Sequence, residues 1–249
     1  MRERLDKLLV ERGYTQSRES ARRLVMAGTV RVADRVVDKP GAMVAADAPI
    51  DVRATEPRFA SRGGLKLEAA LEHFRIALAG CIVLDVGAST GGFTDCVLQR
   101  GARTVYAVDV GYGQLDWKLR NDERVVVLER TNARFLTAEM LPGPASVAVI
   151  DVSFISLRLV VPAVVGCLDA DGTIVALVKP QFEVGKGRVG KGGVVRDPAL
   201  HAEVVEDIRS FAAGLGLEDL GFCESPILGP KGNREFFVAL KKRGPGGSG

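Results

Sequence analysis

One stretch, residues 81–99, constrains the fold of this chain more than any other. An apolar run over residues 81–86 ends in a turn that contains Gly87, Gly91 and Gly92, and a helical pattern follows. This order predicts a buried strand, a tight turn and a helix, with a ligand site at the carboxyl end of the strand. Glycines let a ligand approach the backbone because they carry no Cβ, and the helix N-terminus offers unpaired N–H groups to an anion.

The spacing Gly-x-x-x-Gly-Gly is neither the dinucleotide fingerprint Gly-x-Gly-x-x-Gly nor a triphosphate loop ending in Gly-Lys-Ser/Thr. A second apolar run, residues 104–110, places Asp109 at the end of the next strand, where an acidic residue accepts hydrogen bonds from a ribose. A glycine-rich turn by itself also occurs in purely structural positions. Together with Asp109, it favours a nucleoside-type ligand.

The region from residue 61 to residue 243 alternates apolar runs with helical patterns. Near-continuous apolar strands that alternate with helices are typical of a buried, mostly parallel sheet, so the predicted class is α/β. Strands are predicted at residues 81–86, 104–110, 124–128, 146–150, 173–178, 217–226 and 235–241, and helices from Ser61, over 155–168 and over 198–215.

Residues 1–52 predict a separate small α+β domain. Two short helices, residues 4–9 and 18–27, are followed by short strands, and Ser17 and Gly28 suit the two ends of the second helix. Residues 1–35 hold nine Arg or Lys against five Asp or Glu. The helix arginines are compatible with a solvated face or with a face that contacts phosphates, and we expect the second. The basic residues singled out are Arg4, Lys7, Arg18, Arg22 and Arg23.

Three further segments complete the predicted organisation. A linker is expected at residues 53–60 and a disordered tail at 244–249. Residues 184–197 form a glycine-rich basic loop with Lys186, Arg188 and Lys191, either a flexible surface loop or a substrate-gripping lid. The charged start and the lack of a long apolar run predict a cytoplasmic protein without a membrane span.

Three polar side chains bear on the expected chemistry. Asp151 and Lys179 follow predicted neighbouring strands, and a lysine at a buried strand end needs a partner. On these two residues alone, a structural ion pair and a catalytic pair are both open. Lys66, taken by itself, reads as a surface lysine.

Residues 4–9, 17–25, 28–32 and 39–40 closely resemble the S-four-type RNA-binding module, although Ala33-Asp34 stands where that family usually has Asn-Gly. This resemblance implies docking on structured RNA. Residues 85–95, 151–154 and 178–183 look like the FtsJ-type methyltransferases, and the full chain resembles the TlyA family of ribosomal-RNA 2′-O-methyltransferases. The fold implied is a Rossmann-like class I methyltransferase over residues 61–243.

The resemblance implies S-adenosylmethionine as cofactor, ribosomal RNA as partner, no metal and a catalytic tetrad. The tetrad positions are Lys66, Asp151, Lys179 and Glu235. Lys179 would be the general base, Asp151 would orient it, Lys66 would disfavour its protonation, and Glu235 would hold Lys66 or the ribose. The expected cofactor-binding residues are Asp85, Gly87, Ser89, Thr90, Gly91, Gly92, Phe93, Asp109, Arg130, Thr131 and Asn132. Phe154 or Phe182 would stack on a flipped base or belong to the core.

Two other functions stay open at this point. The family also carries a haemolysin label, and a non-catalytic RNA-binding assembly factor would share the same modules. The 2′-oxygen target excludes DNA. We expect a monomer, and the sequence does not name the modified nucleotide beyond the cytidine that the resemblance implies, in the small subunit, the large subunit or both.

Overall fold

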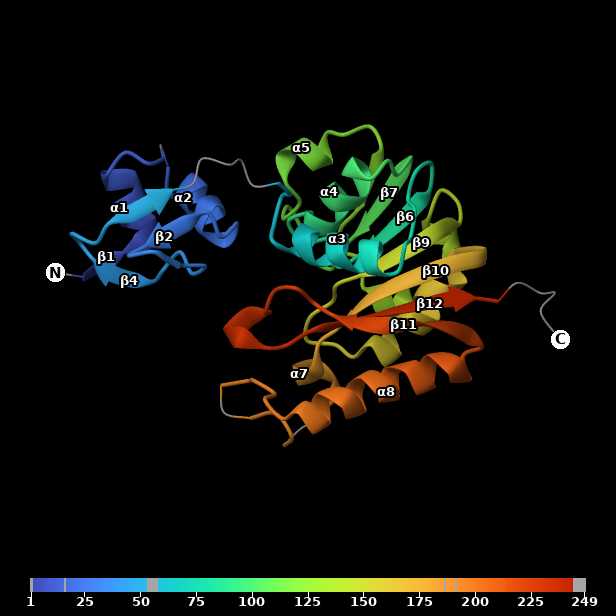
Figure 1. Cartoon of the computed structure of the whole chain (residues 1–249). Coiled ribbons are helices and arrows are strands. Elements are labelled where there is room, and N and C mark those ends of the chain that lie inside the picture. Colours follow the sequence, from blue (N-terminus) through green and yellow to red (C-terminus); the bar gives the residue numbers. More distant parts are fainter. Residues whose placement is uncertain (1, 16, 53–57, 186, 191, 244–249) are drawn as a thin grey trace. The chain divides into compact units, whose positions relative to one another are not determined.

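The structure is a computed structural model of the 249-residue chain, and it describes residues 2–15, 17–52, 58–185, 187–190 and 192–243. The chain divides into two compact units, residues 1–64 and 65–249. Each unit has a hydrophobic core of its own, and Figure 1 labels their helices and strands. Most of the expected linker, residues 53–57, and the expected tail, residues 244–249, lie outside the described residues.

The smaller unit packs two helices against short strands. Its apolar core includes Leu5, Leu9, Ala21 and Val25, each fully buried. The strands form a two-stranded sheet, β1-β4, and a three-stranded sheet, β3-β2-β5. The elements are β1 (Arg2–Arg4), α1 (Leu5–Glu11), α2 (Arg18–Met26), β2 (Val30–Val32), β3 (Arg35–Val36), β4 (Met43–Ala45) and β5 (Ile50–Val52).

The local signals in this unit are confirmed. The Ser17 hydroxyl accepts a hydrogen bond from the Ser20 N–H at 3.2 Å, and α2 begins directly after it. Gly28 has a φ of 73° and follows the end of that helix. Ala33 and Asp34 both have positive φ, as a two-residue hairpin turn requires. Strands β1 and β4 were not predicted, because their residues lack a regular alternation of apolar and polar side chains.

The larger unit contains one seven-stranded sheet with the order β11-β12-β10-β9-β6-β7-β8. Strands β10, β9, β6, β7 and β8 run parallel, and β12 is antiparallel to both β10 and β11. The strands are β6 (Ile82–Val86), β7 (Thr104–Val108), β8 (Val125–Leu128), β9 (Ala145–Ile150), β10 (Leu168–Val178), β11 (Leu217–Glu224) and β12 (Phe236–Lys242). This sheet confirms the predicted α/β, Rossmann-like class.

Helices cover both faces of this sheet. In Figure 1, α3 and α4 lie on one face and α8 lies on the other. Helix α4 packs on β6 and β7, and α8 packs on β11 and β12. The helices are α3 (Gly63–His73), α4 (Gly92–Gln99), α5 (Trp117–Arg120), α6 (Val161–Gly166), α7 (Pro180–Glu183) and α8 (Pro198–Gly214), with 3-10 turns η1 (Ala133–Phe135), η2 (Ala138–Met140), η3 (Leu157–Leu159) and η4 (Pro230–Gly232).

The single helix predicted over residues 155–168 is wrong. The segment forms η3 and α6, because Pro162 lacks an N–H and lies in the first turn of α6, where it begins a helix and cannot continue one. The following strand begins at Leu168 rather than at the predicted Thr173. Its pairing register shifts between those residues, and a Cβ at Gly172 would press on Leu168.

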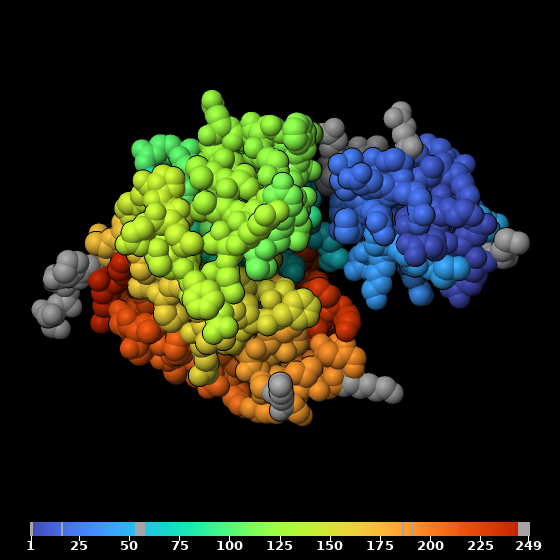
Figure 2. Space-filling view, turned by 180° about the vertical axis from the view of Figure 1, so that it is seen from behind, coloured from blue at the N-terminus to red at the C-terminus, as the bar shows by residue number. Residues whose placement is uncertain are grey.

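Segments that follow β7, β8 and β9 form much of the surface seen in Figure 2, where they are coloured green to yellow. In a parallel sheet these segments gather at the edge where the strands end, which is where a ligand binds. Among the described residues, the helices are too short or too polar to cross a membrane.

Candidate active site

Strand register brings three of the four predicted catalytic residues to one edge of the sheet. Asp151 follows β9, Lys179 follows β10 and Glu235 precedes β12. Ala176 pairs with Ile150 across the parallel strands, and Val178 pairs with Phe236 across the antiparallel ones. Because β12 runs opposite to its neighbour, its beginning lies beside the carboxyl end of β10. The three side chains therefore leave adjacent strands at the same edge.

Lys179 forms an ion pair with Asp151. Its Nζ lies 2.5 Å from Asp151 Oδ1, and the two side chains are 10% and 24% exposed. The same Nζ donates a hydrogen bond of 2.9 Å to the hydroxyl of Ser153. The lysine at the strand end thus has two partners, both in the loop after β9.

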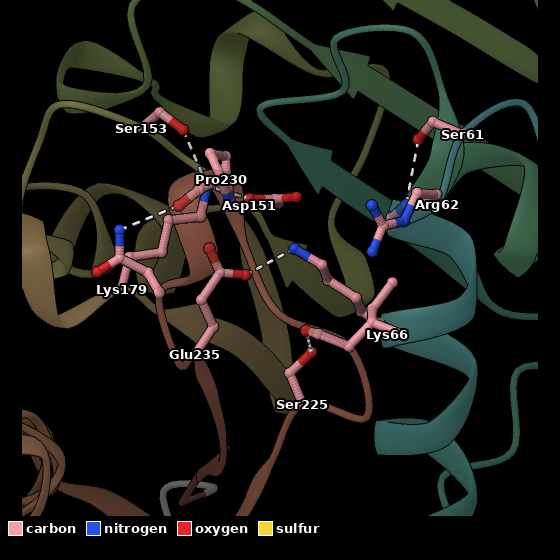
Figure 3. A network of polar contacts seen from close by, with 12 residues as sticks. Ser61, Arg62, Lys66, Asp151, Ser153, Lys179, Ser225, Pro230 and Glu235 are labelled. Carbon is pink, nitrogen blue, oxygen red and sulfur yellow. Dashed lines mark hydrogen bonds and ion pairs between the residues drawn. The ribbon is translucent and has the colours of Figure 1, made fainter. Parts of the chain in front are cut away.

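Lys66 forms a second ion pair, with Glu235. Its Nζ lies 2.6 Å from Glu235 Oε2, and the side chains are 11% and 0% exposed. Lys66 is therefore not the surface lysine that it resembles when taken by itself, because its side chain is buried and its ammonium is paired with Glu235. Figure 3 shows this pair next to the pair of Lys179 and Asp151.

The turn before β12 closes over Glu235. A Cβ built on Gly229 would collide with the carboxylate oxygens of Glu235, while the backbone of Gly229, with a φ of −72°, is open to any residue. Glycine is therefore required here for space alone. Glu235 Oε1 is buried and accepts no hydrogen bond from the residues that the structure describes.

A cavity of about 500 Å³ opens at the same edge, a volume within the usual range for small-molecule sites. Gly87, with a φ of 90°, forms part of its wall, and a Cβ there would collide with the backbone oxygen of Asp151. The glycine thus allows the ends of β6 and β9 to approach each other. The lining residues are Gly87, Ser89, Val108, Asp109, Val110, Gln114, Thr131, Asn132, Ala133, Asp151, Val152, Ser153, Phe154, Ile155 and Val160.

Asp109 organises the wall of this cavity. One carboxylate oxygen accepts the N–H of Ser89 at 2.8 Å, and the other accepts the N–H of Gly111 at 2.7 Å. A carboxylate has about four lone-pair positions, so each oxygen keeps capacity for a ribose hydroxyl. The side chain therefore holds the glycine turn and faces the cavity at the same time.

The predicted cofactor residues divide into two groups. Gly87, Ser89, Asp109, Thr131 and Asn132 line the cavity. The other six do not line it. Asp85 is fully buried, Phe93 lies in the core near Phe237, and Gly91 packs against Leu119. Gly92 begins α4, the carbonyl oxygen of Thr90 accepts a hydrogen bond from the Asp116 N–H, and the Arg130 guanidinium stacks on Tyr112. Gln114 and Ser153 line the cavity and were not predicted, although both lie in loops that follow strand ends.

Comparison with known proteins decides the family. Residues 59–242 match the model described as FtsJ-like methyltransferase, and residues 3–50 match the S4 domain. The chain is 53% identical over 241 residues to the 16S/23S rRNA (cytidine-2'-O)-methyltransferase TlyA of Mycobacterium tuberculosis, covering 96% of this chain and 90% of that one. The chain belongs to the FtsJ-like methyltransferase family.

Two other similar proteins carry a different name. Hemolysin A of Brachyspira hyodysenteriae is 42% identical over 236 residues, which is 94% of this chain and 98% of that one. The solved "putative hemolysin" of Streptococcus thermophilus is 45% identical with a TM-score of 0.77, covering 97% and 89% of the two chains.

The cavity of this FtsJ-like methyltransferase fits S-adenosylmethionine, its methyl donor. Gly87 and Ser89 would hold the methionine end, Asp109 the ribose hydroxyls, and Thr131 and Asn132 the adenine edge. Two features suit a nucleoside with an amino-acid tail. Gly87 leaves no room for a side chain, and the carboxylate of Asp109 can accept further hydrogen bonds.

Asp85 is a buried residue of β6, the strand that ends beside the cavity. Its side chain is completely buried and accepts a hydrogen bond of 2.6 Å from the Thr94 hydroxyl, while its Oδ1 has no partner among the described residues. Burial raises the pKa of Asp85 to about 7, and the nearby charges of Asp151 and Asp109 act in the same direction. The buried carboxyl therefore loses its proton less readily than an exposed aspartate does.

The S4 domain gathers three of the predicted RNA-binding arginines around one acid. Asp6 is fully buried, and its carboxylate lies 2.9 Å from Arg4, 3.1 Å from Arg18 and 3.8 Å from Arg22. The Arg4 guanidinium above all, with help from Arg18, holds the pKa of Asp6 well below its usual range. Since each arginine is about half exposed, the cluster presents fixed positive charge at the surface.

The remaining predicted RNA-binding residues are less concentrated. Lys7 lies 3.3 Å from Glu3 and 3.1 Å from Glu11, and Arg23 donates to the Ser20 hydroxyl at 3.2 Å. Arg188 forms a bidentate ion pair with Glu203 of α8, in which two guanidinium nitrogens donate to the two carboxylate oxygens. Lys186 and Lys191 lie outside the described residues.

Proposed function

We propose that this chain methylates the 2′-oxygen of a cytidine ribose in ribosomal RNA, with Lys179 as general base. The observation that carries the proposal is the meeting of two lysine–carboxylate pairs beside a nucleoside-sized cavity. The similarity to TlyA of Mycobacterium tuberculosis, whose name specifies cytidine-2′-O methylation of 16S and 23S rRNA, supports the choice of substrate.

When bound, S-adenosylmethionine supplies an activated methyl group, whose bond to sulfur breaks with the electron pair remaining on sulfur. A ribose hydroxyl is a weak nucleophile and must lose its proton as it attacks. Lys179, in its neutral form, takes that proton and becomes an ammonium ion beside Asp151, 2.5 Å away. The charge that appears on the base is therefore formed next to a compensating carboxylate.

Lys66 and Glu235 have a positioning role in this proposal. The ion pair of 2.6 Å between Lys66 and Glu235 holds both side chains in place at the edge of the sheet. Glu235 Oε1 keeps an acceptor site for a ribose hydroxyl. Holding the reacting oxygen near the methyl carbon, at about 3 Å, contributes most of the rate in such a displacement.

The RNA partner is recognised mainly through phosphates and shape. The arginines around Asp6 in the S4 domain would contact the backbone, and Arg188 would add a contact near the site. We propose a ribosomal subunit as the substrate, the chain as a monomer, and the cytoplasm, where ribosomal subunits are found, as its location.

The deciding experiment measures transfer of a radiolabelled methyl group from S-adenosylmethionine to small subunits, large subunits and free ribosomal RNA. Wild type, Lys179→Ala and Lys118→Ala are compared, since Lys118 is an exposed lysine away from the tetrad. We expect transfer by wild type and Lys118→Ala, and a loss of about 100-fold or more for Lys179→Ala. Equal incorporation by Lys179→Ala would reject the catalytic assignment.

The same assay separates the competing functions. Mass spectrometry of the treated RNA identifies the methylated nucleotide and subunit. Binding of the cofactor without transfer to any RNA would favour a non-catalytic assembly factor. Release of a dye from liposomes by the purified chain would favour a haemolysin, and intact liposomes would exclude it.

A further inference from the structure

Ser153 is not one of the four tetrad residues, but it contacts Lys179, the predicted general base. It lies two residues after Asp151 in the loop that follows β9 and lines the cavity. Its hydroxyl oxygen accepts a hydrogen bond of 2.9 Å from Lys179 Nζ. A serine on the cavity wall therefore touches the one group that must receive the ribose proton.

The contact to Ser153 differs in kind from the contact to Asp151. The ion pair between Lys179 and Asp151 is short, at 2.5 Å, yet Asp151 Oδ1 takes part in no hydrogen bond with the residues that the structure describes. The attraction between opposite charges depends weakly on angle, whereas a hydrogen bond prefers a nearly straight line. Of these two partners, Ser153 is the one that constrains the direction of the amine.

We propose that Ser153 is a positioning residue that orients the lone pair of Lys179 toward the ribose hydroxyl. The inference rests on the proposed role of Lys179 as general base. A neutral amine has two N–H bonds and one lone pair. With one N–H directed to Ser153 and the second held on the side of Asp151, the lone pair keeps a single direction, away from both. The ribose proton enters along that direction and forms the third N–H bond, and solvent later removes it.

The loop that carries Ser153 is fixed to the segment that carries Lys179. Glu183, four residues after Lys179, accepts hydrogen bonds from the Ser156 hydroxyl at 2.5 Å and from the Leu157 N–H at 2.9 Å. The rings of Phe154 and Phe182 also pack together, with centroids 5.0 Å apart. Ser153 and Lys179 therefore belong to one cross-linked frame, which is what a positioning contact requires.

Removal of the Ser153 hydroxyl frees the amine to rotate about the Cε–Nζ bond among three staggered positions, of which one is productive. We expect Ser153→Ala to lower kcat about tenfold, with the KM for the RNA and the Kd for S-adenosylmethionine within twofold of wild type. Ser153→Thr retains a hydroxyl and is expected to recover most of kcat. A kcat of Ser153→Ala within twofold of wild type, or no recovery in Ser153→Thr, would overturn the proposal.

A second measurement needs neither cofactor nor RNA. The apo protein is labelled briefly with isotope-coded acetic anhydride at pH 8, and the acetylation of Lys179 is compared with that of Lys118 by peptide mass spectrometry. Loss of the hydroxyl removes the hydrogen bond that holds Nζ, so we expect Lys179 to react about threefold faster in Ser153→Ala. An unchanged rate would mean that water replaces the hydroxyl, and would contradict the positioning role.

Ser156→Ala is the matched control, because it removes a hydroxyl from the same loop without a contact to Lys179. We expect it to lower the melting temperature and to leave the acetylation rate of Lys179 unchanged. Faster acetylation in Ser156→Ala would show that a loosened loop is sufficient, and would also overturn the proposal. If wild type methylates no ribosomal RNA, the proposed function fails, while the acetylation comparison still decides whether Ser153 controls the amine.

Discussion

Lys66 and Glu235 lie 169 positions apart in the sequence and meet at 2.6 Å, with the glutamate completely buried. Loss of one partner leaves the other charge buried and uncompensated, which costs about 3–5 kcal/mol. We therefore expect Lys66→Ala to lower the free energy of unfolding by several kcal/mol and to abolish methyl transfer. Denaturant unfolding and the subunit assay measure the two effects.

A double variant, Lys66→Met with Glu235→Leu, separates stability from function. Apolar residues of similar size often replace a buried ion pair without loss of stability. We expect the double variant to recover much of the unfolding free energy and none of the activity. Turnover at the wild-type rate in this variant would show that the pair is structural.

Gly229 limits the space around Glu235. Because its φ of −72° suits alanine, the effect of Gly229→Ala comes only from the clash with the carboxylate. We expect kcat to fall ten- to a hundredfold, the scale of a displacement near 1 Å, with little change in cofactor affinity. The control is Gly214→Ala at the end of α8, where a Cβ meets no neighbouring atom. Equal activity of the two variants would argue against a role for Glu235.

Asp85 makes stability depend on pH. Its pKa is raised by burial from 3.8 to about 7, so the native state binds more protons than the unfolded chain between these values. The free energy of unfolding therefore falls as pH rises through this window, and the slope vanishes above it. From pH 5 to pH 8, we expect the free energy of unfolding to fall less in Asp85→Asn than in wild type. The difference between the two falls should be on the order of 2 kcal/mol. Urea unfolding at both pH values tests this, and parallel pH profiles would contradict it.

The contribution of Asp6 to stability depends on pH in the opposite direction. Its pKa is lowered, chiefly by the hydrogen bond from Arg4, so its contribution is present above the unfolded value near 4 and is lost as pH falls below it. We expect Asp6→Asn to destabilise the smaller unit at pH 7 by about 1–2 kcal/mol, with the difference disappearing in acid. Hydrogen exchange of residues 5–26 reports this unit directly. Unchanged protection at pH 7 would show that the arginines do not depend on Asp6.

Phe154 is an exposed aromatic beside the cavity. It is 90% exposed, has a φ of 65°, and packs on Phe182. Stacking of an RNA base on an aromatic ring contributes about 1–3 kcal/mol, so we expect Phe154→Leu to lower kcat/KM on ribosomal RNA about tenfold. Cofactor affinity, measured by calorimetry, should not change. Unchanged turnover in Phe154→Leu and in Phe182→Leu would reject stacking.

The strands and their ends could be predicted because apolar runs and the polar residues that follow them are local signals. Asp151 and Lys179 were found in this way, and their meeting follows from the parallel register of β9 and β10. The burial of Lys66 could not be predicted from the chain alone, because it depends on the carboxylate of Glu235, which lies just before β12. Ser153 and Gln114 carry no distinctive pattern, and only the folded loops show what they contact.

The prediction of one helix over residues 155–168 was wrong for a similar reason. Residues 155–168 have helical periodicity, but Pro162 and the register shift before Thr173 divide the segment into a 3-10 turn, a short helix and an extended strand. Such a division depends on where the neighbouring strand offers hydrogen bonds. Periodicity along the chain does not contain that information.

Strand β12, the last strand described in the chain, lies inside the sheet between β10 and β11. During translation, the sheet stays open at this place until nearly all of the larger unit has been synthesised. Glu235 arrives with the same strand, so the nascent polypeptide cannot assemble its complete set of acidic and basic groups early. A methyltransferase built in this way would complete its site only after β12 has been synthesised.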